Sequence, residues 1–149
     1  MPGPHNAYLA HHAQLLFESH RRLLGKPLLP GSEDPQALYE APLVVVSHDT
    51  AADPVFNYAN LAAQRLFEMD WETFTTLPSR LSAGLMHRDE RRRLLERVSR
   101  DGYIDDYAGI RVARSGKQFR IESATVWNAF DAAGAYAGQA ACFSTWRDV

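Results

Sequence analysis

Apolar residues at helical spacing open the chain and define an N-terminal region. Between residues 6 and 24 they return at roughly one-heptad intervals with polar residues between them, which predicts an amphipathic helix ending at Gly25 and Pro27. The next segment, 25–42, holds four prolines and two glycines and predicts a linker or wrapping arm. A short helix is expected within it over 32–41, with Ser32 as its N-cap. We therefore expect residues 1–42 to form an N-terminal helix and arm.

The hydrophobic pattern changes after this arm. Residues 43–46 form a short, wholly apolar run rich in valine, and 55–58 resume strand character after a polar loop, so the two runs predict a hairpin. Asn60 stands where an N-cap belongs, ahead of an apolar periodicity that predicts a helix over 61–69. Asp70 is expected to cap a further short turn, and a longer helix is predicted from about residue 88 to residue 100.

The last third of the chain alternates with the period of a β-strand. Strands are predicted over 107–114, 118–128 and 136–146, with turns between them. The predicted order is a helix, two strands, several short helices and three strands in a meander. This order indicates an α+β domain. We expect a five-stranded antiparallel sheet over 43–149, with short helices on one face and the N-terminal helix flanking it.

Several stretches resemble the PAS superfamily, and within it the MEKHLA domain family. VFNYANLAAQRLF resembles the PAS opening, LMHRDERRRLLERV the start of its connecting helix, and YAGQAACFSTW its closing strand. The resemblance to MEKHLA domains is carried by three longer segments, 47–83, 105–128 and 138–146, and covers nearly the whole chain. It implies a PAS-like fold and a role in sensing a chemical, light or redox signal, and it names no ligand.

Charge and composition indicate which binding partners and which cellular compartment are expected. The 149 residues carry a formal net charge of −2, which gives no electrostatic reason to expect nucleic acid or an anionic membrane surface as a partner. No signal peptide or continuous apolar span is evident. The single cysteine, Cys142, excludes an internal disulfide and is typical of a reducing compartment. A cytoplasmic location is therefore expected.

The resemblance to PAS domains makes it possible to check whether the chain has the residues that flavin photochemistry requires. The flavin-binding LOV branch of PAS domains uses a reactive cysteine in the region that here spans 70–78, and this segment has none. It also uses a glutamine in the last strand. Alignment through Gly138 places Ala140 at that point, with Gln139 facing the other way. Flavin–thiol chemistry is therefore not expected, and Cys142 is expected to be a core residue.

The sequence gives little support for a metal site, a haem site or a catalytic site. His11 and His12 are adjacent on a helix and point about 100° apart, which is poor geometry for one shared ion. Haem PAS domains use a helical histidine as axial ligand, so His87 stays a weak candidate, but haem and metal are not expected. The neighbours Ser47, His48 and Asp49 cannot converge as a triad, and we expect no enzyme activity.

A ligand pocket would lie between the inner face of the sheet and the short helices. Its candidate lining is aromatic and apolar, which suits a flat or greasy molecule, although the same residues would equally fill a closed core. The candidates are Phe56, Tyr58, Phe67, Trp71, Phe74, Ile110, Phe119, Ile121, Ala140 and Cys142.

Two functions remain open. The first is a stand-alone sensory domain that binds a small molecule or cofactor, of unknown identity, and signals through dimerisation or a signalling protein partner. The second is a ligand-free dimerisation or protein-interaction module with a closed hydrophobic core. In either case a homodimer is expected through the N-terminal helix. The helix's apolar stripe consists of Tyr8, Leu9, Leu15, Leu16, Leu23 and Leu24.

Overall fold

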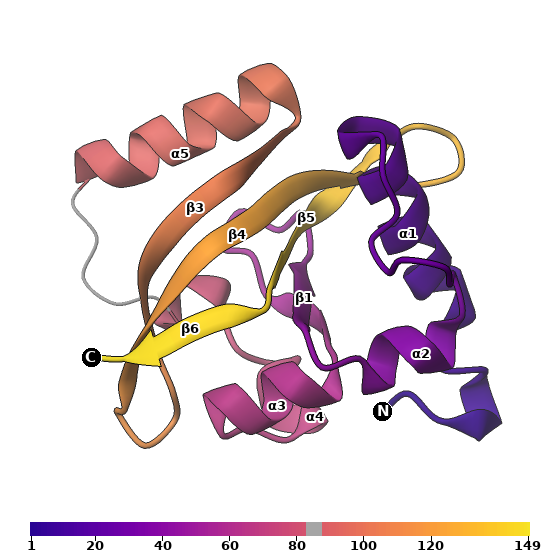
Figure 1. The fold of residues 1–149 in the computed structure, drawn as a ribbon, viewed down its shortest axis with the longest axis horizontal. Helices are drawn as coiled ribbons and strands as arrows, with labels where there is room; N and C mark the ends of the chain where they lie inside the picture. The colour runs from indigo at the N-terminus through magenta and orange to yellow at the C-terminus, as the bar shows by residue number, and fades with distance from the viewer. Residues whose placement is uncertain (83–87) are drawn as a thin grey trace.

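A single antiparallel sheet organises the computed structural model, which describes residues 1–82 and 88–149, with the side chains of 88–91 excepted. In the sheet the strands follow the order β2-β1-β5-β4-β3, and β6 pairs with β4 (Figure 1). The strands are β1 Val44–His48, β2 Phe56–Ala59, β3 Tyr103–Val112, β4 Gln118–Phe130, β5 Tyr136–Phe143 and β6 Thr145–Asp148. The helices are η1 Pro4–Asn6, α1 Ala10–Leu24, α2 Pro35–Glu40, α3 Leu61–Phe67, α4 Trp71–Phe74, η2 Ser79–Ser82 and α5 Arg88–Asp101.

The predicted antiparallel architecture is confirmed, and the strand expected over 136–146 is divided in two. β5 pairs with β4 as far as Cys142 opposite Thr125, and β6 resumes the pairing at Thr145 opposite Glu122. Between these pairs β4 contains Ser123, whose φ of 52° lies in the left-handed region. This irregularity interrupts the ladder and lets the last segment of the chain run beside the other half of β4.

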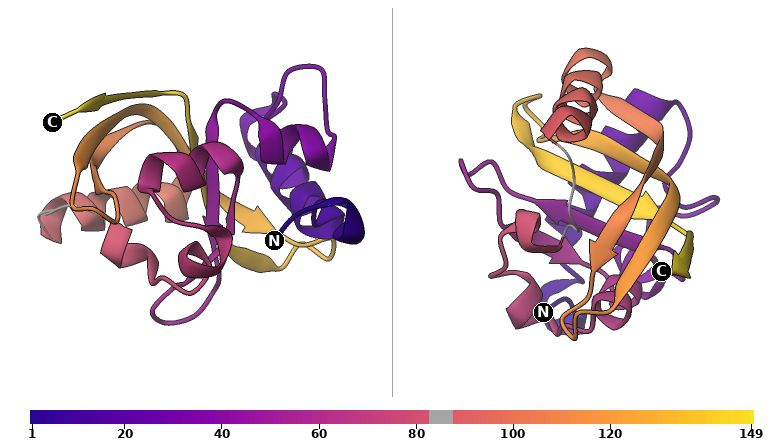
Figure 2. Two further views of the ribbon diagram at one scale, coloured as in Figure 1. Left: turned by 90° about the horizontal axis from the view of Figure 1, so that it is seen from below. Right: turned by 90° about the vertical axis from the view of Figure 1, so that its left-hand side faces the viewer.

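The sheet separates two hydrophobic clusters, and helices cover both of its faces. On one side, residues of β1, β3, β4 and β5 pack with α3, α4 and α5, around Phe67, Phe74 and Phe119. On the other side, α1 and α2 pack against the same strands, around Leu16, Phe17 and Trp127. Figure 2 shows α1 and α2 on one side of the strands and α5 on the other. The N-terminal region therefore forms one layer of the domain.

Two details of this region differ from the sequence prediction. The helix begins at Ala10 rather than at residue 6, because Ala7, Tyr8 and Leu9 all take left-handed backbone angles after η1. Asp34, not Ser32, caps α2 by accepting a hydrogen bond from the Ala37 backbone N–H at 3.1 Å. Ser32 instead accepts one from the backbone of Asp34 and so stabilises the turn before the cap.

The two other predicted N-caps are confirmed. Asp70 accepts a bond from the Thr73 backbone N–H at 2.8 Å and begins α4. Asn60 is fully buried and caps α3 through the Ala63 N–H, and its oxygen also accepts the Val45 N–H of β1. Its amide donates to the backbone carbonyls of Leu38 and Leu43. One side chain thus joins α2, α3 and the first strand.

Candidate functional site

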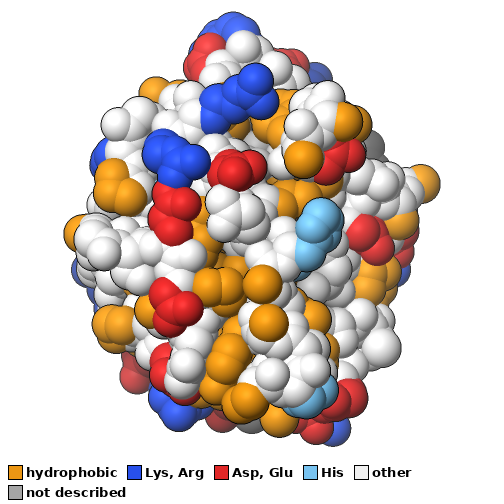
Figure 3. Space-filling model, turned by 90° about the vertical axis from the view of Figure 1, so that its right-hand side faces the viewer, with side chains coloured by type: hydrophobic (Ala, Val, Ile, Leu, Met, Phe, Trp, Pro, Cys, Tyr) orange, Lys and Arg blue, Asp and Glu red, His pale blue; other side chains and the backbone are white. Residues whose placement is uncertain are grey.

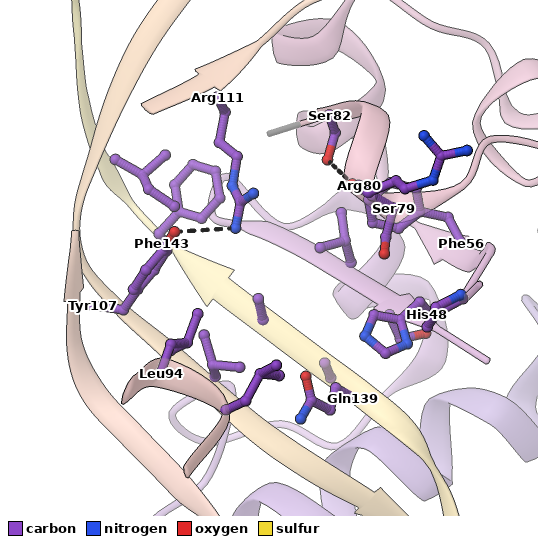
Figure 4. A pocket seen from close by; sticks show the side chains of 18 of the residues that line it. His48, Phe56, Ser79, Arg80, Ser82, Leu94, Tyr107, Arg111, Gln139 and Phe143 are labelled. Atoms are coloured by element: carbon purple, nitrogen blue, oxygen red, sulfur yellow. Dashed lines mark hydrogen bonds between the residues drawn. The ribbon is translucent and has the colours of Figure 1, made fainter. Parts of the chain in front are cut away.

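A cavity of about 510 Å³ lies on the α3 and α5 side of the sheet (Figure 4). Its floor is the sheet, formed by β1, β3, β4 and β5, and its walls come from α3, η2, α5 and the end of the β1–β2 loop. The volume falls in the range of small-molecule sites, about 300–1,000 Å³. The lining residues are Val46, Ser47, His48, Pro54, Phe56, Phe67, Ser79, Arg80, Ser82, Leu94, Leu95, Tyr107, Arg111, Ile121, Val126, Tyr136, Gln139, Ala140, Ala141 and Phe143.

Part of the predicted aromatic set forms the apolar wall of this cavity. Phe56, Phe67 and Ile121 line it directly. Phe74 and Phe119 are fully buried behind that wall, with ring centroids 5.4 Å and 5.1 Å from the ring of Phe67. These edge-to-face contacts fix the phenyl rings and give the wall a defined shape.

Another part of the predicted set lies on the opposite face of the sheet, beneath α1. Tyr58 stacks on His12 at 5.6 Å, and Trp71 meets the edge of Tyr58 at 5.7 Å. Burial raises the pKa of the Cys142 thiol, also in this cluster, to about 11, so the thiol stays protonated and unreactive. Ala140 belongs to the same cluster but also reaches the cavity.

Strand register explains which side chains enter the cavity. Gln139 and Ala141 of β5 line it, whereas the sequence alignment expected Gln139 to face away. That expectation was wrong, because Gln139 pairs with His48 and Ala141 with Val46, and these two residues of β1 both line the cavity. On β3, Ile110 pairs with Arg120 on the opposite face, and its neighbours Gly109 and Arg111 pair with Ile121 and Phe119 on the cavity face.

The structure adds a polar lining that the sequence analysis missed. Arg111 and Tyr107 enter from β3, with the guanidinium 3.4 Å from the phenol oxygen. Ser79 and Ser82 come from η2, and His48 ends β1. Alternation along β3 was the available signal, since Tyr107 and Arg111 share a face, but the sequence predicts the more hydrophobic Ile110 of the other face as the lining residue.

Ser47, His48 and Asp49 form no catalytic triad. The His48 ring bonds the backbone oxygen of Asp49 at 2.8 Å. Ser47 instead lies 2.9 Å from His12 of α1 and donates to Asn57 at 2.5 Å. This chain of bonds fastens α1 to the edge of the sheet. Burial, with a smaller contribution from His11, lowers the pKa of His12 to about 4, so the imidazole is neutral in the fold.

Within 1–82 and 92–149, no three His, Cys, Asp or Glu side chains gather closely enough to hold a metal ion. His20, one of the histidines of α1, meets the edge of the Trp127 ring at 5.0 Å and bonds the Lys26 carbonyl through Nδ1. The weak haem candidate His87 lies outside the described residues.

The outer side of α1 and α2 is a mixed surface. Of the apolar stripe predicted for dimerisation, Leu16 is fully buried against the sheet, and the others are half-buried. Hydrophobic side chains gather in the middle of this face, with acidic and basic side chains around them (Figure 3). One ion pair on it, between Arg21 and Glu33, joins α1 to the segment before α2.

These features define the class of protein. A five-strand antiparallel order of β2-β1-β5-β4-β3, with short helices and a connecting helix on one face, is the PAS fold. Solved PAS structures share it, including the PAS domain of a protein from Colwellia psychrerythraea, with a TM-score of 0.60, 14% identity, and coverage of 76% of this chain and 92% of that one.

Two Light-Oxygen-Voltage structures resemble the chain to a similar degree. An RNA-binding Light-Oxygen-Voltage receptor matches with a TM-score of 0.60 and 21% identity over 82% of this chain, but over only 35% of the receptor. A Light-Oxygen-Voltage domain described with a flavin analogue matches at 0.60 and 14%, covering 80% of this chain and 86% of that domain. At such identities the likeness shows the fold.

The family follows from the sequence itself. The model of the MEKHLA domain matches residues 10–148, and the chain belongs to this family. The match begins at the first residue of α1, so the helix that covers the second face of the sheet lies within the family's own boundaries. No curated protein matches the chain. Among the helices of the described residues, none is long and apolar enough to cross a membrane.

Proposed function

We propose that this chain is a sensory domain that binds a small molecule in the cavity between the sheet and α5. The observation that carries the proposal is the cavity of about 510 Å³, whose lining combines apolar walls with the polar side chains of Tyr107, Arg111 and His48. Apolar walls with a few polar groups are the usual make-up of a small-molecule site. No constellation for nucleophilic catalysis accompanies it among the described residues, so we propose binding rather than turnover.

The sheet offers a route by which binding would be relayed. β5 presents Ala141 to the cavity and Cys142 to the cluster under α1, so the same strand touches both layers. α1 is joined to the sheet by polar bonds as well as by packing, since Ser19 accepts the Phe130 N–H at 2.8 Å. A ligand that shifts β5 would change the packing of α1, which is the element we propose to transmit the signal.

The signal would leave through a second molecule. We propose a homodimer or a signalling partner that contacts the outer face of α1 and α2, where hydrophobic side chains gather (Figure 3). The alternative function, a dimerisation module that binds no ligand, shares this surface and differs only in the use of the cavity. Light scattering gives the mass in solution, and ligand titration separates the two functions.

A paired substitution tests the binding function. Ala141→Trp places an indole in the cavity, whereas Ala133→Trp places the same side chain in the exposed turn between β4 and β5. Thermal unfolding is measured with a metabolite panel for both variants and for the native chain. We expect stabilising compounds for the native chain and Ala133→Trp, and none for Ala141→Trp. A panel that stabilises all three proteins equally, or none of them, contradicts binding in this cavity.

A further inference from the structure

We propose that the ligand of this cavity is an amphiphilic carboxylate, with its carboxylate bound by Arg111 and its apolar body lying along the sheet. This inference rests on the proposed binding function and specifies the chemical class of the ligand. It follows from the placement, charge and surroundings of a single guanidinium.

Arg111 enters the cavity from β3, and its neighbours hold it there. Figure 4 shows the side chain extending toward the phenol of Tyr107, which lies 3.4 Å from Nη2. The guanidinium carbon is 5.6 Å from the centre of the Tyr107 ring. Gly109 between them makes this arrangement possible, because a Cβ there would lie 2.5 Å from the Tyr107 hydroxyl. The absence of a side chain at Gly109 thus leaves room for the Tyr107 phenol to lie beside the Arg111 guanidinium.

The charge of Arg111 is not neutralised within the described part of the chain. Arg111 is half-buried, its guanidinium interacts with the phenol of Tyr107, and no carboxylate of residues 1–82 or 92–149 forms an ion pair with it. Arg80, the other arginine of the lining, differs: it pairs with Asp53 at 3.1 Å and points away from the cavity centre in Figure 4. A partly desolvated cation without a counter-ion favours an anionic ligand.

The geometry and the lining of the site indicate which class of anion it would bind. A guanidinium presents a planar fork of donors that matches the two oxygens of a carboxylate, and one such group balances one negative charge. The same cavity is lined by Phe143, Ile121 and Val126, which would contact an apolar body and not a second charge. Across the cavity, His48 and Gln139 provide polar atoms (Figure 4). The Gln139 amide donates to Asn128 at 3.3 Å, which leaves its oxygen to accept a bond from a hydroxyl or amide at the far end of the ligand.

Matched acids and amides test the inference on the full chain. Calorimetric titrations use 4-phenylbutyrate and decanoate, each compared with its own amide, which keeps the shape and removes the charge. For the native chain we expect the acids to bind at least tenfold more tightly than the amides. Arg111→Gln is expected to remove that preference while amide binding persists, and Arg111→Lys to restore it in part.

Arg114→Gln is the matched control, because it removes the same charge from an exposed position three residues further along the hairpin. It is expected to keep the preference for acids, and the melting temperatures of all variants confirm that they are folded. Amides that bind the native chain as well as the acids do, or an acid preference that survives in Arg111→Gln, overturn the carboxylate assignment and leave the binding function standing. If neither acids nor amides bind, the carboxylate assignment is wrong, and the metabolite panel with Ala141→Trp decides the binding function separately.

Discussion

His12 of α1 stacks on Tyr58 of β2, with ring centroids 5.6 Å apart and planes inclined by 24°. The same imidazole lies 2.9 Å from Ser47 of β1. One histidine therefore joins the N-terminal helix to two strands at the edge of the sheet. It does so as a neutral ring, because protonation would place a charge between α1 and the sheet.

The first prediction concerns pH. Burial lowers the pKa of His12 from 6.5 to about 4, so the unfolded chain takes up the proton at a higher pH than the fold does. The stability contributed by the neutral ring is present above pH 6.5 and is lost as the pH falls toward 4, at most about 3 kcal/mol. Burial lowers the pKa of His20 as well, which adds to the loss. Urea unfolding between pH 7 and pH 4 measures it.

His12→Gln should make this pH dependence clearly shallower, although the variant is less stable at pH 7. His5→Gln, at an exposed position, is the control and should follow the native curve. An unchanged slope in His12→Gln would mean that other groups, His20 or carboxylates, and not this imidazole, determine the acid sensitivity.

The second prediction concerns the buried amide of Asn60. Its oxygen accepts from Val45 and Ala63, and its amide donates to Leu38 and Leu43. Asn60→Ala leaves these buried backbone groups without partners and should cost about 3 kcal/mol or more. Asp70→Ala removes an exposed cap of the same kind and should cost about 1 kcal/mol. Denaturant unfolding compares them, and equal losses would contradict the joining role given to Asn60.

The third prediction concerns Gly138 in β5. Its φ of +125° lies outside the range of ordinary side chains, and a Cβ there would overlap the backbone carbonyl of His48. Gly138→Ala should therefore destabilise the fold by more than about 3 kcal/mol. Gly116→Ala, with φ of +92° but open space around it, should cost about 1–2 kcal/mol from backbone strain alone. Similar midpoints in urea for the two variants would show that the close approach to His48 is absent.

The fourth prediction concerns removal of α1. Deleting residues 1–24 exposes Tyr58, Trp127 and the rest of the cluster beneath the helix. We expect a poorly soluble chain that binds hydrophobic dyes, and not a clean conversion of dimer to monomer. Phe17→Ala, a milder change at a buried position, should cost about 3–5 kcal/mol. A truncated chain with native thermal stability would show that α1 is not a layer of the domain.

Sequence reasoning predicted the architecture well because most of its signals are local. Asn60 and Asp70 cap the helices expected of them, and the strands fall close to their predicted runs. Which side chains enter the cavity depends on the pairing register of the strands, and local sequence patterns do not determine that register. Ile110 is more hydrophobic than Arg111, yet pairing with Arg120 turns Ile110 to the other face. An arginine that faces a cavity from within a strand breaks the rule that apolar residues point inward.

The same dependence on strand register explains why the predicted aromatic lining is divided between the two faces of the sheet. A sheet covered on both faces makes alternate residues equally apolar, so periodicity cannot assign a residue to one face. Val45 and Val46 are both buried, one beneath α1 and one in the cavity cluster. For that reason the sequence predicts one lining shared by Tyr58, Cys142, Phe56 and Phe67. The second layer exists because α1 packs on the sheet, a long-range contact that local periodicity does not encode.

Methyl NMR tests the central claim most directly, since the two faces of the sheet carry separate probes. A ligand found in the panel is titrated into protein labelled at its Ala, Ile, Leu and Val methyl groups. We predict the largest shifts for Ile121, Val126 and Ala141, which line the cavity, and smaller ones, relayed through β5, for Leu16, Leu38 and Val45 beneath α1. Shifts largest at Leu16, Leu38 and Val45, or confined to surface methyl groups, would contradict a binding site in the cavity.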